Sequence, residues 1–321
     1  MKNYITIDGG TTNTRICLVS DGVIIDTVKL SVGARAGIDS GDLLKMKIKD
    51  GITELLNQNN FSKDDIIKIL ASGMITSEFG LCNLPHIKTP AGIAELNSSM
   101  FETNLSEISQ IPFVFIRGVK SGVDNEDSLW ENDMMRGEET ELAGIVTLEN
   151  ISSDCLFVLP GSHSKLIETD MQGRITAFST MLTGEMIAAL SQNTILKDAV
   201  DLSIENADEE YLIKGFEYCS EYGINDALFK ARVLKNRFGL GAEKIYSFFL
   251  GTVLCSEIKR IIGSEIGTVA IGGKRQIKEA TVCILKKVSD KKIILISDKT
   301  VEYSTSIGMI KIYEYDKQKD S

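Results

Sequence analysis

The chain has 321 residues, of which 43% are hydrophobic and 25% are charged, and its formal net charge is −10 at pH 7. This length and composition are those of a globular protein of two domains, and no apolar run approaches the roughly 20 residues that span a bilayer. The negative charge argues against nucleic acid and anionic membrane as partners, so an anionic ligand would need positive potential from Lys, Arg, backbone N–H groups or a metal ion.

The N-terminal segment MKNYITIDGG lacks the basic, apolar and cleavage regions of a signal peptide, so a cytoplasmic location is expected. The six cysteines include no C-x-x-C pair, which argues against a thiolate metal site. The sequence leaves a homodimer open as the assembly.

The first part of the chain predicts a mixed α/β sheet. Three strands in a meander are expected at 4–7, 15–19 and 23–30. Apolar residues recurring every three or four positions predict a helix over 44–56. Two further strands are expected at 66–70 and 111–116, separated by a loop region that contains Pro85 and Pro90.

The second part repeats this order about 150 positions later. A polar stretch over 121–135 predicts a loop, and RGEETELAGIV predicts a helix. Three antiparallel strands are then expected at 155–160, 164–169 and 174–180. This repeated order of elements predicts two domains, residues 1–147 and 148–321.

The remainder of the second domain is predicted to be mostly helical. Helical spacing covers 208–219, 225–238, 242–262, 274–287 and a last helix from residue 300. Strands are expected at 268–271 and 291–296.

The turn after the first strand, DGGTTN, is richer in polar groups than a plain hairpin requires. The Gly10 and Thr11 amides and the hydroxyls of Thr11 and Thr12, followed by Asn13, predict a binding turn for phosphate oxygens. Asp8 ends the strand and is the predicted ligand of Mg²⁺, usually through water. The alternative is a solvated turn with a local Asx hydrogen bond.

A second turn of the same kind occurs in LPGSHSKLIE, residues 159–168. Gly161 is followed by the hydroxyls of Ser162 and Ser164, and Lys165 adds a positive charge. His163 is either a hydrogen-bond donor to phosphate or an ordinary turn residue.

A third turn, in TVAIGGKRQIKEA, brings a buried strand to Gly272 and Gly273 at the start of a helix. A double glycine allows an adenine or ribose to lie against backbone, although taken singly it favours a tight strand-to-helix turn. The chain contains neither G-x-x-x-x-G-K-[ST] nor G-x-G-x-x-G, so a P-loop and a nicotinamide fingerprint are excluded.

The three turns resemble, in order and spacing, the phosphate-1, phosphate-2 and adenosine motifs of the actin-like ATPase superfamily. The resemblance narrows at DMMRGEETELAG (133–144), VLPGSHSKLI (158–167) and STMLTGEM (179–186). These look like the M-R-G-E-E-T, P-G-T-H-x-K and M-T-G-E blocks of the 2-dehydro-3-deoxygalactonokinase family, and the resemblance covers essentially the whole chain.

The resemblance implies a two-domain actin-like (ribonuclease H-like) ATPase fold, α/β in class, each domain a mixed sheet with flanking helices and an ATP cleft between. It also implies ATP- and Mg²⁺-dependent phosphorylation of the 6-hydroxyl of 2-dehydro-3-deoxy-D-galactonate. Two positions depart from the family pattern: Gly9 stands where Trp is usual, and Ser162 stands where Thr is usual.

Related sugar kinases often place an aspartate before the helix that leads to phosphate-2, and Gly137-Glu138-Glu139 stands at that place here. Glu138 is therefore the expected catalytic base, kept ionised by the helix N-terminus, with Asp8 as the second choice. The alternative is that Glu138 and Glu139 are simply favourable first-turn acids.

The substrate side is expected to use Arg136 for the carboxylate or a phosphate, because Arg offers bidentate geometry. Arg15, Arg117 and Lys165 are the other cations near the motifs, and a structural salt bridge is the alternative role for Arg136. Further candidate substrate residues are Met74, Ser77, Thr183 and Glu185.

Two alternatives to this function stay open. One is a kinase for a related sugar acid or ketose. The other is an actin-like ATPase that acts as a switch rather than as a kinase.

Overall fold

The computed structural model describes residues 1–36, 41–151 and 154–316. Two compact units are present: Met1–Ser153 with Thr169–Ala177 and Lys299–Ser321, and Asp154–Glu168 with Phe178–Asp298. Each unit combines separate stretches of the chain, and the division expected at 147/148 stays a prediction. The return of the C-terminal segment to the first unit was not part of that expectation.

The first unit is built on a six-stranded sheet of order β3-β2-β1-β4-β7-β6. β1, β2 and β3 form an antiparallel meander, and β4 and β7 add parallel strands beside β1. The strands are β1 (Asn3–Gly9), β2 (Thr14–Ser20), β3 (Val23–Leu30), β4 (Lys68–Gly73), β6 (Phe101–Thr103) and β7 (Phe113–Phe115).

The second unit contains a five-stranded sheet of order β12-β11-β10-β13-β14. β10 pairs antiparallel with β11 and parallel with β13, as β1 does with β2 and β4. The strands are β10 (Leu156–Leu159), β11 (Ser164–Thr169), β12 (Ile175–Met181), β13 (Thr268–Ile271) and β14 (Lys292–Leu295). The repeated order, three meander strands followed by parallel strands, confirms the predicted actin-like fold of two α/β units.

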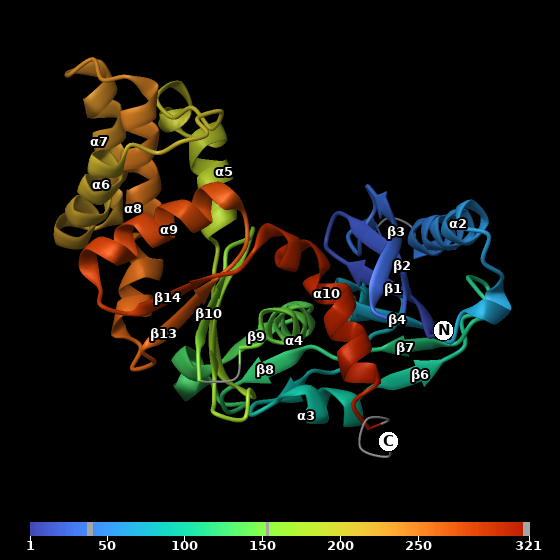
Figure 1. Ribbon diagram of the computed structural model, residues 1–321. Helices are drawn as coiled ribbons and strands as arrows, with labels where there is room; N and C mark the ends of the chain where they lie inside the picture. The colour runs from blue at the N-terminus through green and yellow to red at the C-terminus, as the bar shows by residue number, and fades with distance from the viewer. Residues whose placement is uncertain (37–40, 152–153, 317–321) are drawn as a thin grey trace. The chain divides into compact units, whose positions relative to one another are not determined.

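Helices cover both faces of the first sheet (Figure 1). One face packs with α2 (Gly41–Gln58) around a cluster that includes Ile7 and Ile48. The other face meets α4 (Glu138–Glu149) and α10 (Asp298–Tyr313): Ser72 Oγ and Thr140 Oγ1 lie 2.7 Å apart, and Thr6 Oγ1 donates to Ser306 Oγ at 2.8 Å. The first bond joins α4 to β4, and the second joins α10 to β1.

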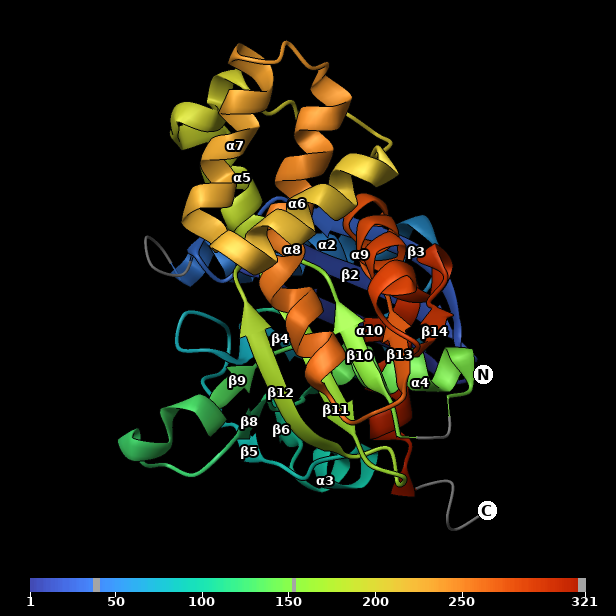
Figure 2. The same cartoon turned by 90° about the vertical axis from the view of Figure 1, so that its left-hand side faces the viewer.

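The core of the second unit forms around α8 (Ala242–Gly263), whose residues are buried along most of its length. α6 and α7 pack beside it, as Figure 2 shows. The remaining helices are α5 (Thr183–Asn193), α6 (Glu209–Tyr222), α7 (Ile224–Asn236) and α9 (Arg275–Val288). All of the helices predicted for this half are found, with ends within three residues of those expected.

The region between β4 and α4 differs most from the prediction. The expected loop over 121–135 is wrong, because it contains a 3-10 helix and β9 (Asp133–Met135). β9 joins β8 (Val119–Ser121) and β5 (Ile87–Lys88) in a small three-stranded sheet, and a short helix, α3 (Ile93–Ser98), lies in the expected proline-containing loop. Elements of two to six residues carry too little periodicity to be recognised in sequence.

No helix in the described part of the chain has the length and hydropathy needed to cross a membrane.

Candidate active site

The predicted phosphate-1 turn closes the hairpin between β1 and β2. Gly10 N donates to Asn13 O at 2.8 Å, so this amide is used within the turn, and its contact with a phosphate stays a prediction. Thr11, Thr12 and Asn13 are exposed, and Thr12 Oγ1 accepts from Asn13 Nδ2 at 3.1 Å. The groups that the turn presents outward are therefore the threonine side chains and Asn13.

Three backbone segments of the first unit meet beside Asp8. Gly73, with φ +89°, ends β4 next to Gly9, and a Cβ built on Gly73 would lie 2.5 Å from Gly9 O and 3.5 Å from Asp8 Oδ1. Gly137, with φ +109°, approaches Gly73 so that its own Cβ would lie 3.3 Å from Gly73 Cα. The start of α4 and the Asp8 carboxylate therefore lie at the same ends of two parallel strands.

The two acids at the start of α4 have different environments. Both oxygens of Glu139 accept from Gly137 N at 2.9 Å, and Thr140 Oγ1 donates to Oε1 at 3.1 Å. Glu139 is buried, and burial together with the charge of Glu138 raises its pKa to about 8. Glu138 is half-buried, and its Oε2 accepts from Arg136 N at 3.2 Å. Glu139 is thus a structural cap, and Glu138 is the more accessible carboxylate.

A third acid of this helix, Glu141, was not predicted. Burial and the charges of Glu138 and Asp8 raise the pKa of Glu141 to about 8, while Arg15 opposes the rise. Burial also raises the pKa of Asp8, and Arg15, its cross-strand neighbour, lowers it. Glu141 lies three residues after Glu138 and so on the same helix face, a spacing that could have identified it in the sequence.

Among the residues that the structure describes, no three His, Cys, Asp or Glu side chains lie close enough to hold a metal ion. Mg²⁺ does not require such a group, since it is commonly held by one or two carboxylates together with waters and substrate phosphates. The Asp8 carboxylate, at a strand end beside an exposed hydroxyl-rich turn, fits that kind of donor set.

The guanidinium group of Arg136 donates hydrogen bonds to oxygens of the segment after β4. Its Nη1 donates to Thr76 O and Thr76 Oγ1 at 2.8 Å, and Nη2 donates to Leu84 O at 2.6 Å. These bonds tie the segment after β4 to the start of α4, and direct contact of Arg136 with a substrate anion stays a prediction. Ser77 is buried and donates to the carbonyl of Met74 at 2.7 Å, and Met74 is half-buried.

Two other candidate cations also bond to backbone. Arg15 Nη1 donates to Glu302 O at 2.6 Å, and Arg117 Nε donates to Ser99 O at 2.8 Å. Of these, Arg15 is the one beside Asp8.

In the second unit, the N-terminus of α5 rests on the predicted phosphate-2 turn. A Cβ on Gly184 would lie 2.3 Å from Gly161 O, and Glu185 N donates to Ser162 O at 3.2 Å. His163 Nε2 and Glu185 Oε1 are 3.0 Å apart at the exposed surface. The T-G-E sequence of this helix, expected on the substrate side, thus supports the turn.

The side chains after the turn are buried. Ser164 has no exposed surface, and Lys165 is 4% exposed, with Nζ donating to Thr180 Oγ1 at 2.6 Å. Neither side chain faces outward in this structure, and their contact with a phosphate stays a prediction. Ser162 and His163 are the exposed side chains of this turn.

The third motif adjoins the second. Gly272 N donates to Val158 O at 2.9 Å, and Gly273 has φ +80° with a Cβ position 2.4 Å from Pro160 O. Both turns follow parallel strands, β10 and β13, where ligands of open α/β sheets commonly bind. The structure therefore brings together the two motifs that the sequence placed about 110 positions apart.

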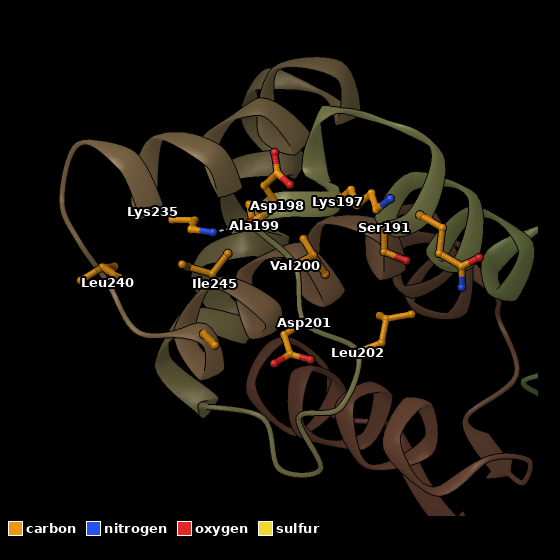
Figure 3. A pocket seen from close by; sticks show the side chains of 12 residues that line it. Ser191, Lys197, Asp198, Ala199, Val200, Asp201, Leu202, Lys235, Leu240 and Ile245 are labelled. Atoms are coloured by element: carbon orange, nitrogen blue, oxygen red, sulfur yellow. Dashed lines mark hydrogen bonds between the residues drawn. The ribbon is translucent and has the colours of Figure 1, made fainter.

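An open pocket of about 740 Å³ lies elsewhere in the second unit, between α5, α7, α8 and the segment 195–202 (Figure 3). Lys235 Nζ donates to Asp198 O at its edge. None of the predicted motif residues lines this pocket, so it gives no support to the nucleotide-binding prediction.

The model of the 2-keto-3-deoxy-galactonokinase family matches residues 8–302. The chain is 24% identical over 260 residues to 2-dehydro-3-deoxygalactonokinase of Escherichia coli (strain K12), covering 79% of each protein. It is 28% identical over 198 residues to DgoK1 of Rhizobium meliloti (strain 1021), a candidate enzyme of the same name, covering 61% of this chain and 59% of that protein.

The crystal structure of a candidate 2-dehydro-3-deoxygalactonokinase from Sinorhizobium meliloti superposes with a TM-score of 0.76 at 19% identity, over 98% of this chain and 99% of that one. This likeness shows the shared fold. The family match over most of the chain confirms the relationship that the three sequence blocks predict. The chain therefore belongs to the 2-keto-3-deoxy-galactonokinase family.

Proposed function

We propose that this protein transfers the γ-phosphoryl group of ATP to the 6-hydroxyl of 2-dehydro-3-deoxy-D-galactonate. The observation that carries the proposal is the same in each unit: polar or glycine-containing turns meet a helix N-terminus at the ends of parallel strands. Family membership and the names of the relatives support the substrate.

The first unit supplies the carboxylates. Glu138 accepts the proton of the 6-hydroxyl as the O6–P bond forms and the bond from the γ-phosphorus to the β–γ bridging oxygen breaks. Its placement at the start of α4, beside Asp8 and more accessible than Glu139, supports this role. Asp8 would hold Mg²⁺, which neutralises phosphate charge, and Thr11 and Thr12 would donate to phosphate oxygens.

The second unit supplies donors for the nucleotide. Gly161, Ser162 and His163 would bind phosphate through backbone N–H groups and exposed side chains, and Gly272-Gly273 would receive the adenosine. The support is the direct packing of Gly273 on Pro160, which joins these two motifs. The buried side chains of Ser164 and Lys165 would support the turn from the interior of the unit.

The sugar side is proposed to include the segment after β4. Arg136 would fix that segment through its bonds to Thr76 and Leu84, and Met74 and Ser77 would then shape the wall of the sugar site.

A coupled assay of ADP release tests the proposal against a panel of 2-keto-3-deoxy sugar acids and ketoses. Fast turnover is expected with the galactonate member and slow ADP release without any sugar. Activity with another panel member alone would replace the substrate by a related sugar acid or ketose. ATP hydrolysis that no sugar accelerates would instead favour the switch protein.

A further inference from the structure

A buried acid of the second unit has no role in the function described so far. Glu257, on α8, is 1% exposed, and its Oε2 accepts from Thr183 Oγ1 at 2.7 Å. The Ser164 hydroxyl faces the same carboxylate without the geometry of a hydrogen bond. Among the described residues, neither Glu257 Oε1 nor Ser164 Oγ has a hydrogen-bond partner.

The two residues beside Glu257 lie on the elements that adjoin the phosphate-2 turn, β11 and α5. Ser164 is the first residue after the turn, at the start of β11. Thr183 is the first residue of α5, and the next two residues, Gly184 and Glu185, contact Gly161 and Ser162 from that helix. The carboxylate thus lies beneath the point at which the turn and the helix N-terminus join.

A buried carboxylate with so few partners is costly for stability, because burial removes its hydration and burial raises its pKa. An apolar residue of similar size would fill this place at lower cost. An acid at this place gives Thr183, the first residue of α5, a buried hydrogen-bond acceptor, with the Ser164 hydroxyl beside the same carboxylate.

We infer that Glu257 is a positioning residue for ATP: its carboxylate links α8 to Thr183 at the start of α5, and α5 in turn holds the backbone of Gly161–His163 that receives the phosphates. The inference rests on the proposed function of this turn. Glu257 itself is buried and has no direct contact with the nucleotide in this account.

The test uses the full chain with Glu257→Leu and Glu257→Gln. Isothermal titration with Mg·ATP, without any sugar, gives the nucleotide Kd, and steady-state kinetics gives KM for ATP and for the sugar acid. A displacement of about 1 Å at an active site can lower the reaction rate by ~100-fold. We therefore expect Glu257→Leu to raise both the Kd and the KM for ATP by about tenfold. The sugar KM should stay within about twofold, and Glu257→Gln, which keeps an acceptor for Thr183, should restore most of the ATP affinity.

Thr252→Val is the matched control, because Thr252 is buried on the same helix and its hydroxyl bonds to Phe248 O, away from the turn. It should lower the melting temperature without changing the ATP Kd. Thr183→Val removes the donor and not the carboxylate, so it should raise the ATP Kd in the same direction as Glu257→Leu, and the two changes combined should be less than additive.

A folded Glu257→Leu protein with wild-type ATP affinity would overturn the inference, as would equal increases in both KM values. If Glu257→Leu does not fold, Thr183→Val decides the matter, and an unchanged ATP Kd in that variant is the contradicting result. Wild-type protein that binds ATP and phosphorylates no sugar acid would refute the proposed function alone. Wild-type protein that binds no ATP would refute both.

Discussion

The candidate site residues of the first unit and those of the second are of different chemical kinds. The start of α4 in the first unit concentrates carboxylates, and burial and mutual repulsion raise the pKa of two of them, Glu139 and Glu141, to about 8. The phosphate-2 turn of the second unit is built from backbone and glycine contacts, with the buried carboxylate of Glu257 underneath and that of Glu185 beside His163 at the surface. Substitutions at the start of α4 should therefore change the chemical step, and those at the phosphate-2 turn should change nucleotide binding.

The largest effect is expected for Glu138→Gln, which removes the proposed base. A general base contributes about 10² to 10⁴ in rate, so kcat should fall by ~100-fold or more while the ATP Kd stays unchanged. Coupled ADP assays and calorimetry measure the two quantities. Glu54→Gln, an exposed acid on α2, is the control, and near-normal turnover of Glu138→Gln would remove this residue from the role.

Gly184→Ala, in contrast to Glu138→Gln, is expected to change ATP binding. The added methyl would lie 2.3 Å from Gly161 O, so α5 or the turn must shift. A shift of this size should raise KM for ATP by about tenfold with a smaller change in the sugar KM. Gly263→Ala is the matched control, because nothing lies within 4 Å of its Cβ position. Parallel increases in both KM values would contradict the assignment of the phosphate-2 turn to nucleotide binding alone.

Arg136→Lys should mainly affect stability and the sugar side. Lys cannot reproduce the fork that bonds Thr76 and Leu84 at once, so the unfolding free energy should fall by about 1–3 kcal/mol. The KM for the sugar should rise as the segment after β4 loosens. Denaturant titration and kinetics would check both, and a loss of sugar affinity at unchanged stability would instead favour direct contact between Arg136 and the substrate.

The smallest effect concerns pH. Glu141 binds a proton in the folded state up to a pKa of about 8 and in the unfolded state only up to 4.5, so stability should fall as pH rises between these values. Each such group changes the unfolding free energy by about 1 kcal/mol per pH unit within the window. Glu141→Gln should match the wild type at pH 4, below the unfolded-state pKa, and be more stable by at least about 1 kcal/mol at pH 8. Equal pH profiles from denaturant titration would contradict the assigned environment.

Much of the fold is predictable because its main elements are long or strongly periodic. The strands at Val23–Leu30, Ser164–Thr169 and Thr268–Ile271 have the expected bounds, and α8 follows its apolar run. The return of α10 to the first unit could not be predicted, because it depends on contacts between residues about 300 positions apart, such as Thr6 with Ser306.

The site was predictable at the level of motifs and not of side-chain directions. Glycine-containing turns after strands identified the positions of Gly161 and Gly273, whose proximity the structure shows. Burial decides which side chains face outward, and it turned Ser164 and Lys165 inward. Glu257 carries no local signal, since it lies within a helix whose spacing indicates burial without naming a partner.

The most direct test of the whole account is the structure of the product. ³¹P and ¹H NMR of a reaction with ATP and 2-dehydro-3-deoxy-D-galactonate should show a phosphomonoester coupled to the protons on carbon 6, formed in a one-to-one ratio with ADP. Phosphate on another carbon, or ADP formed with free phosphate and unchanged sugar, would contradict it.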